Sequence, residues 1–184
     1  MAARREARLR SSRRRPAGKG PNRDSDRKGM AMQGFQPLDP DYEARTRDSF
    51  ARQGIMATLG AELTRVEPGL VEIVLPYRPA LSQQHGFFHA GVTSTIGDSA
   101  GGYAAFTLFP AEATVLTVEY KINLLAPADG RRLRALGTVF RTGRTLSVCD
   151  VAVYVEKDGR ERPCAKLLQT LMRLDGRPDR PAGA

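Results

Sequence analysis

From residue 113 onward, apolar and polar residues alternate along the chain, a pattern that indicates β-strands. The first strand of this region would carry an apolar face formed by Leu116, Val118, Tyr120, Ile122 and Leu124. Turn residues then separate three further predicted strands, which cover 132–141, 145–156 and 162–174. Asp158-Gly159 is typical of a tight turn, so we expect the last two strands to pair antiparallel.

The preceding half of the chain predicts two helices and a hairpin. Asp39-Pro40 has the residues of a helix start, and this first helix would run to about Ala57. Residues 61–66 and 70–75 alternate on either side of Pro68-Gly69, which predicts a hairpin.

The second helix, expected from about His89 to just before Pro110, has almost no polar face. Asp98 is the one charged residue between Ala90 and Phe109. Such a helix should be buried on all sides. Its glycines cost about 1 kcal/mol each relative to alanine, so they indicate that other backbone approaches closely. They are Gly91, Gly97, Gly101 and Gly102. We therefore predict an α+β fold in which an antiparallel sheet wraps around this helix.

The length of 184 residues suggests one folded domain, and the formal charge of +9 is concentrated at the N-terminus. Residues 1–28 contain nine Arg and two Lys against three acidic residues, a net charge of +8, so the remainder carries +1. This distribution argues against a nucleic-acid-binding domain. We expect a basic, disordered tail over residues 1–34, a folded domain over 35–175 and a frayed tail over 176–184.

Three interpretations of the basic tail are open. Its Arg-rich, acid-poor composition is typical of an organelle transit peptide, and its charge would also suit an arm that binds a polyanion. Met30 and Met32 stand where the periodic pattern begins, so the preceding residues could instead lie before the true start of translation. The 24 Arg against 5 Lys fit a GC-rich coding bias and favour this last interpretation.

Cys149 and Cys164 are expected to be small core or sheet residues. In the predicted hairpin Cys149 faces Leu168 and Cys164 faces Val153, so the two thiols do not meet. Two cysteines make neither a disulfide framework nor a zinc site, which favours a reducing compartment. The sequence has no apolar stretch of about 18 residues that would indicate a transmembrane helix. We expect a cytoplasmic protein, or an organellar one if the tail is a transit peptide.

Residues 97–101, Gly-Asp-Ser-Ala-Gly, match the G-x-S-x-G motif that presents the nucleophile of serine hydrolases. That serine needs a histidine to accept its proton, and in α/β-hydrolases the histidine follows the serine. Both histidines of this chain, His85 and His89, precede Ser99. The motif also requires a preceding strand, whereas residues 90–96 continue a helical pattern. We therefore interpret Ser99 as a helix-packing residue.

Asp98 and the start of the second helix are the strongest candidates for chemistry. A carboxylate on a buried helix is costly unless it is paired or used. The start of this helix, His89-Ala90-Gly91, would offer backbone N–H groups and the positive end of the helix dipole to a developing oxyanion. A base beside such a site suits hydrolysis of an activated ester. Alternatively, Asp98 caps the amides of a neighbouring loop and His89 fixes the preceding loop.

The spacing of His89 and Asp98 predicts a site shared by two chains. Nine residues at 100° per residue place them on opposite sides of the helix, about 13 Å apart along its axis. One helix cannot bring both to a single substrate atom, whereas two antiparallel copies can each supply one half. We therefore expect a symmetric homodimer, alone or within a tetramer.

The segment from Gln83 to Gly91, Gln-Gln-His-Gly-Phe-Phe-His-Ala-Gly, followed by Asp98, resembles the PaaI-type (phenylacetate-degradation) branch of the hot-dog-fold acyl-CoA thioesterases. The motif of that branch has an Asn, a Gly three residues later, then His-Gly-Gly and a catalytic Asp nine residues after the His. The resemblance extends from about Arg45 to Leu174. Gln83 replaces the Asn, and Ala90 replaces the first Gly.

The resemblance implies catalytic roles. Asp98 would be the general base or nucleophile, and the N–H of Ala90, with help from that of Gly91, would polarise the thioester carbonyl. His89 would orient the loop or contact the thioester. Thr117 stands where the family often has a Ser or Thr that positions the water, although strand alternation puts Thr117 on the face opposite to Leu116.

The resemblance also implies an acyl-CoA substrate, hydrolysed to free acid and CoA without a metal or redox cofactor. Arg141 and Arg144 flank a turn where cations could meet the coenzyme A phosphates. Phe88, with its neighbour Phe87 and with Tyr103, would suit an apolar or aromatic acyl pocket, although core packing explains these residues as well. The alternatives are an acyl-binding hot-dog protein without turnover, or a dehydratase in which His89 pairs with an acid.

Overall fold

The structure is a computed structural model that describes residues 34–177, 179 and 180. The predicted basic tail lies outside the described residues apart from Gly34. The elements follow one another in this order: α2 (Tyr42–Ala51), α3 (Gly54–Leu59), β1 (Glu62–Glu67), β2 (Leu70–Pro76), the short 3-10 helix η1 (Pro79–Leu81), α4 (Ala90–Phe106), β3 (Ala113–Leu124), β4 (Arg132–Thr142), β5 (Leu146–Lys157) and β6 (Arg160–Asp175).

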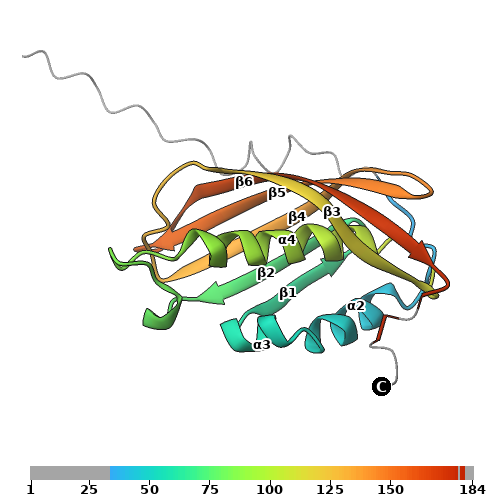
Figure 1. Ribbon diagram of the computed structural model, residues 1–184, viewed down its shortest axis with the longest axis horizontal. Coiled ribbons are helices and arrows are strands. Elements are labelled where there is room, and N and C mark those ends of the chain that lie inside the picture. Colours follow the sequence, from blue (N-terminus) through green and yellow to red (C-terminus); the bar gives the residue numbers. More distant parts are fainter. Residues whose placement is uncertain (1–33, 178, 181–184) are drawn as a thin grey trace, which may run out of the picture. The chain divides into compact units, whose positions relative to one another are not determined.

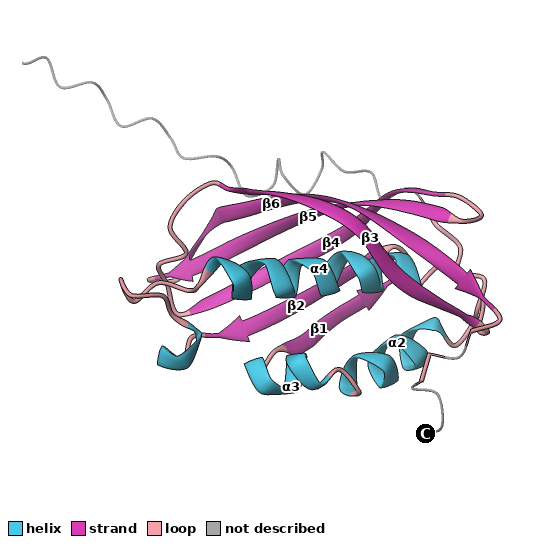
Figure 2. Ribbon diagram, viewed as in Figure 1, coloured by secondary structure: helices cyan, strands magenta, loops and turns pink. Residues whose placement is uncertain are grey.

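The six strands form one antiparallel sheet in the order β1-β2-β4-β5-β6-β3. The sheet curves around α4, and α2 and α3 lie along the side of β1 (Figures 1 and 2). This arrangement confirms the predicted α+β hot-dog fold, an antiparallel sheet wrapped around a long central helix.

Small residues allow α4 and the sheet to approach closely. A Cβ atom on Gly101 of α4 would lie only 2.9 Å from Cγ2 of Val151 on β5. A Cβ atom on Gly137 of β4 would overlap the backbone of Ala100 on α4. The expectation of burial on all sides is wrong for the first half of α4, where Asp98 and Ser99 are half-exposed.

The first predicted helix is in fact two helices, because the backbone leaves the helical conformation at Gln53. Gln53 is extended (φ −73°, ψ 102°) and precedes α3, which ends at Gly60 in the left-handed conformation (φ 73°). The first helix also begins later than predicted. Oδ1 of Asp39 accepts a 2.9 Å hydrogen bond from the N–H of Asp41, so Asp39 caps the turn that precedes α2.

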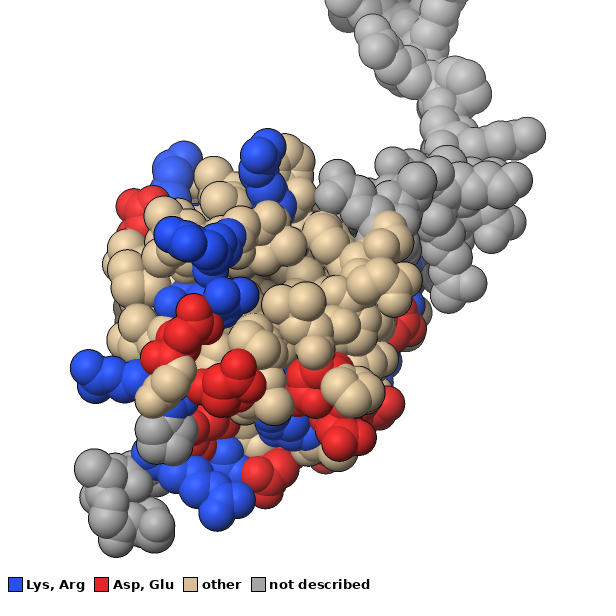
Figure 3. All heavy atoms as spheres, turned by 90° about the vertical axis from the view of Figure 1, so that its right-hand side faces the viewer, with Lys and Arg blue, Asp and Glu red and all other residues tan. Residues whose placement is uncertain are grey.

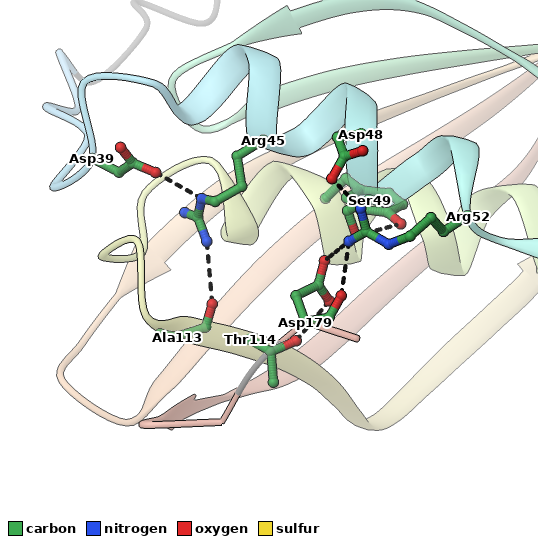
Figure 4. Close-up of polar contacts among 9 residues, drawn as sticks. Asp39, Arg45, Asp48, Ser49, Arg52, Ala113, Thr114 and Asp179 are labelled. Carbon is green, nitrogen blue, oxygen red and sulfur yellow. Dashed lines mark hydrogen bonds and ion pairs between the residues drawn. The ribbon is translucent and has the colours of Figure 1, made fainter. Parts of the chain in front are cut away.

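Arg45 joins α2 to the end of α4 (Figure 4). Its guanidinium donates hydrogen bonds to the backbone oxygens of Phe106 (3.2 Å), Phe109 (2.8 Å) and Ala113 (3.1 Å), and it forms an ion pair with Asp39 at 2.7 Å. Backbone oxygens at the end of a helix have no partner within the helix. Arg45 binds oxygens at and just beyond the end of α4 and so fixes α2 against the C-terminal end of α4.

A β-bulge in β3 reverses the alternation expected for this strand. Thr117 pairs with Leu171 and Glu119 pairs with Thr170, so Val118 is the extra residue. Before the bulge the odd positions face α4, and after it the even positions do. The predicted apolar face is therefore split, and Leu116 and Val118 are 54% and 53% exposed. Thr117 lies on the inner face, contrary to what alternation suggested for a pocket role.

The β5–β6 hairpin closes at Asp158-Gly159 as predicted, but its register is different beyond the turn. A shift between Val153 and Tyr154 places Cys149 opposite Gln169 instead of Leu168. The same shift places Ala165, instead of Cys164, opposite Val153, and Cys164 donates a hydrogen bond from Sγ to the backbone oxygen of Val153. Both cysteines are buried and free, which confirms that their thiols do not meet. Burial raises the pKa of Cys149 to about 12 and that of Cys164 to about 11.

The segment after β6 is not frayed throughout. Asp179 forms an ion pair of 2.8 Å with Arg52 and accepts a 2.9 Å hydrogen bond from Thr114. The expectation of a frayed tail from residue 176 overlooked these side-chain contacts, which need no strand pairing. On the face shown in Figure 3, acidic and basic side chains lie next to one another in the lower half, whereas the charged side chains of the upper half are mostly basic.

Candidate active site

Asp98 lies on α4 where β3 and β6 pass beside the helix. Its Oδ1 accepts a hydrogen bond of 2.7 Å from Oγ1 of Thr117 and one of 2.6 Å from Nε2 of Gln169. Its Oδ2 accepts no hydrogen bond from the residues that the structure describes. The carboxylate is therefore fixed through one oxygen, and the other is free to contact a substrate or a water molecule.

The surroundings of Asp98 change its acidity. Burial raises the pKa of the carboxyl above its usual value, and the hydrogen bond from Thr117 opposes that change. A carboxylate with a raised pKa is a stronger proton acceptor once it is ionised. The group is therefore suited to act as a general base or as a nucleophile.

Gln169 is a site residue that the sequence reasoning missed. It is 1% exposed and lies between Leu167 and Leu171 on the inner face of β6. Besides Asp98, its Nε2 contacts Oγ1 of Thr117 at 3.2 Å. The sequence does contain a signal for Gln169, which is a polar residue among apolar residues on one face of the predicted strand. A buried amide requires hydrogen-bond partners, so such a position is a candidate for a polar contact.

His89 caps the start of α4. Its backbone is extended (φ −66°, ψ 141°), and its Nδ1 accepts a 2.9 Å hydrogen bond from the N–H of Gly91. This bond occupies the N–H that was expected to assist Ala90. The N–H of Ala90 itself donates no hydrogen bond within the described part of the chain, and Ala90 is exposed. The backbone N–H of Ala90, and not that of Gly91, is therefore the hydrogen-bond donor that remains free.

The loop before α4 is held by its own hydrogen bonds. Oε1 of Gln83 accepts a hydrogen bond from the N–H of His85, and the backbone oxygen of Gln83 accepts one from Gly86 at 2.9 Å. Gln83 thus uses its amide oxygen inside the loop. Phe88 is 3% exposed and packs edge-to-face on Tyr77, with ring centroids 5.2 Å apart. Phe88 lies in the core and does not line the cavity beside Asp98.

The structure does not bring the other predicted residues to Asp98 within one chain. Ala90 precedes Asp98 by eight residues, a separation of about 12 Å along the helix axis. Arg141 and Arg144 are exposed at the β4–β5 turn, where β4 approaches Gly69. Gly69 donates a hydrogen bond to Thr107 at the C-terminal end of α4. The two arginines are therefore at the opposite end of α4 from Ala90.

Ser99 has no nucleophilic environment. It lies inside α4, with no strand-to-helix turn before it, and its Oγ donates a 3.3 Å hydrogen bond to Oε1 of Gln53. Both histidines lie before α4 or at its start. The position of Ser99 within a helix agrees with the packing role that we assigned to it.

A cavity of about 410 Å³ opens beside Asp98. It lies between α2, α4, β3 and the C-terminal segment, and its walls combine polar and apolar side chains. The lining residues are Ser49, Arg52, Gln53, Asp98, Ser99, Gly102, Tyr103, Val115, Leu116, Thr117, Asp179 and Arg180. Tyr103 was among the residues expected at an acyl pocket, and it lines this cavity.

Comparisons with known proteins agree with the fold. Residues 85–161 match the family model described as Thioesterase superfamily. A thioesterase family protein from Silicibacter pomeroyi is 53% identical, with a TM-score of 0.73 over 73% of this chain and 99% of that one. The proofreading thioesterase EntH of Klebsiella pneumoniae is 26% identical over 60% of this chain and 80% of its own.

The PaaI protein of E. coli, from the phenylacetic acid degradation operon, shares the fold. Its TM-score is 0.68 at 16% identity, over 76% of this chain and 98% of that one. Within the part of the chain that the structure describes, no helix is long and apolar enough to cross a membrane. The match to the family model and the 53% identity confirm the resemblance to hot-dog thioesterases, and the chain belongs to the thioesterase superfamily.

Proposed function

We propose that this protein hydrolyses an acyl-CoA thioester to the free acid and CoA, with Asp98 as the general base or nucleophile. The observation that carries the proposal is the carboxylate of Asp98, held through Oδ1 by Thr117 and Gln169 and free at Oδ2 beside a cavity. Raising the pKa of a carboxyl by burial suits it to accept a proton during reaction.

As general base, Oδ2 of Asp98 takes a proton from a water molecule while the water oxygen attacks the thioester carbon. Thr117 and Gln169 keep Oδ1 in place, so Oδ2 stays directed to the water. The tetrahedral intermediate then expels the thiolate of CoA, which takes up a proton. In the nucleophilic alternative Oδ2 attacks the carbon directly and expels the thiolate of CoA, which takes up a proton. Water then hydrolyses the resulting mixed anhydride to the free acid and the Asp98 carboxylate.

The oxyanion of the intermediate would be bound by the N–H of Ala90 from a second copy of the chain. The separation of about 12 Å between Ala90 and Asp98 along one helix supports a site shared by two chains. The edge position of β3 also supports it, because an unpaired strand edge favours pairing with another chain. Leu116 and Val118, half-exposed on β3, would be covered in a homodimer, which could be half of a tetramer.

Other predicted contacts remain proposals. In a dimer with antiparallel α4 helices, Arg141 and Arg144 of one copy would approach the start of α4 of the other, where coenzyme A phosphates could bind them. His89 would keep the loop in place through its hydrogen bond to Gly91. We also propose a cytoplasmic location, because the two free, buried cysteines suit a reducing compartment.

Turnover of a panel of acyl-CoAs, followed by detection of the free thiol, tests the function. Release of CoA from at least one of them, lost in Asp98→Asn, supports the proposal. Binding of acyl-CoA without release would instead favour a non-catalytic acyl-binding protein. Hydration of an enoyl-CoA would favour a dehydratase, which needs His89 as an acid–base group although its Nδ1 is bonded to Gly91.

A further inference from the structure

The cavity beside Asp98 contains a second polar cluster, made by Ser49, Arg52, Tyr103 and Asp179. Ser49 and Tyr103 share a hydrogen bond of 3.1 Å between their hydroxyl groups. Nη2 of Arg52 donates to Oδ2 of Asp179 at 2.8 Å and to its backbone oxygen at 2.7 Å. Figure 4 shows Asp179 between Arg52, which directly follows α2, and Thr114 of β3, with Ser49 close by.

The polar cluster and Asp98 lie at different ends of the cavity, and their separation can be measured along its two walls, β3 and α4. On β3, Thr117 contacts Asp98 and Thr114 contacts Asp179, and three residues of a strand span about 10 Å. On α4, Tyr103 follows Asp98 by five residues, or about 7.5 Å. The cavity therefore runs from the carboxylate of Asp98 to the contact between Arg52 and Asp179.

We propose that the ion pair between Arg52 and Asp179 closes this end of the cavity and limits the length of the acyl group. The inference rests on the proposed function, because it places the acyl chain in the cavity that begins at Asp98. Gly102, Val115 and Leu116 line the cavity between its two ends and offer carbon atoms to such a chain.

The chemistry of the closing contact explains the limit. Asp179 accepts hydrogen bonds from Arg52 and Thr114. A longer apolar chain would have to displace this carboxylate, or remove water from the charged groups without replacing their hydrogen bonds, and either is unfavourable. Arg52 also contacts Asp48 of α2, so its guanidinium is held at the end of α2, while Asp179 belongs to the C-terminal segment. Asp179 and Arg52 are thus specificity-determining residues.

The test compares butyryl-, octanoyl- and palmitoyl-CoA in the full-length protein, in Asp179→Ala and in Arg52→Gln. We expect both variants to raise the ratio of kcat/KM for the longest to that for the shortest chain by on the order of tenfold or more, a factor that one or two methylene groups can supply in a binding pocket. Asp175→Ala is the matched control. Asp175 is the last residue of β6, four residues before Asp179; the variant removes its ion pair with Arg173, and Asp175 does not line the cavity.

Binding of the same three acyl-CoAs to Asp98→Asn, with and without Asp179→Ala, separates this inference from the proposed function. If the wild-type protein hydrolyses none of them, the proposed function fails, whereas a shift of affinity toward the longer chains on removal of Asp179 still supports the length limit. The length limit is overturned if the preference for acyl chain length, in turnover and in binding, is the same with and without Asp179. It is also overturned if Asp175→Ala shifts that preference as much as Asp179→Ala does.

Discussion

The hydroxyl of Thr117 donates a 2.7 Å hydrogen bond to Oδ1 of Asp98 and so joins β3 to α4. The same Oδ1 accepts the amide of Gln169, which leaves Oδ2 without a partner among the described residues. One oxygen of the carboxylate is thus a structural acceptor and the other is available for reaction.

Asp98→Asn should abolish hydrolysis, whereas the neighbouring variant Ser99→Ala should retain most of it. The amide oxygen of Asn can still accept the hydrogen bonds of Thr117 and Gln169, but the side chain cannot take a proton. Loss of a general base costs on the order of 10²–10⁴ in rate. Release of free thiol measures both variants, with thermal unfolding as the control for folding. Loss of activity in Ser99→Ala alone would instead support a serine hydrolase.

Thr117→Val should move the acidic limb of the pH profile to higher pH. As the proposed base, Asp98 would act as a carboxylate, so we expect kcat/KM to fall as the pH drops through its pKa, which burial raises. Thr117 lowers that pKa by its hydrogen bond, and its removal should raise the pKa further. The control is Thr170→Val, because Thr170 contacts Glu119 and not Asp98. An acidic limb that stays in place in Thr117→Val would contradict the assignment of Asp98 as the base.

Gly101→Ala and Gly102→Ala should have opposite effects on stability although they are neighbours on α4. A Cβ on Gly101 would collide with Gln169 and lie 2.9 Å from Val151, whereas on Gly102 the nearest atom would be 4.0 Å away. Overpacking costs about 1–3 kcal/mol, and a helical glycine changed to alanine gains up to about 1 kcal/mol. Denaturant unfolding measures both. Equal free energies of unfolding would mean that the sheet does not press on Gly101.

The sequence predicted the elements well and the side-chain directions less well. The run from Ala90 to Phe109 with one charged residue was enough to predict a helix inside a sheet, because such a helix has little polar surface, although the first half of α4 is not buried on all sides. The direction of Thr117 depended on a bulge at Val118, which a period of two cannot reveal. The register of the last hairpin failed for the same reason, through the shift beside Val153.

The residues around Asp98 were only partly predictable. Asp98 was noticeable as a charge in an apolar run, but Gln169 is 71 residues away in sequence and meets it only because β6 passes beside α4. Asp179 lies in the segment after β6, which was expected to fray. A periodic pattern cannot predict a single side-chain contact such as the one between Asp179 and Arg52. Contacts between distant elements depend on how the sheet curves, which local patterns do not encode.

The last prediction concerns the shared site and uses two inactive variants that should rescue each other. Asp98→Ala removes the base. Ala90→Pro removes the free N–H at the start of α4 while keeping the helix, because proline is favoured at the first helical position and His89 is already in the extended conformation that proline requires of its predecessor. Each homodimer should be nearly inactive, since both of its sites lack one half.

In a mixed dimer one site carries both lesions, and the other combines an intact Ala90 from one chain with an intact Asp98 from the other. Random exchange of subunits makes about half of the dimers mixed, each with one good site, so roughly a quarter of the wild-type activity should return if the dimer is two-fold symmetric. Free-thiol release measures the recovery, after mass spectrometry of differently tagged chains has shown that subunits exchange. If exchange is complete and the activity stays at the level of the parent variants, Asp98 and Ala90 do not act on one substrate from two chains. The oxyanion would then need a donor other than Ala90, because about 12 Å separates Ala90 from Asp98 along a single helix.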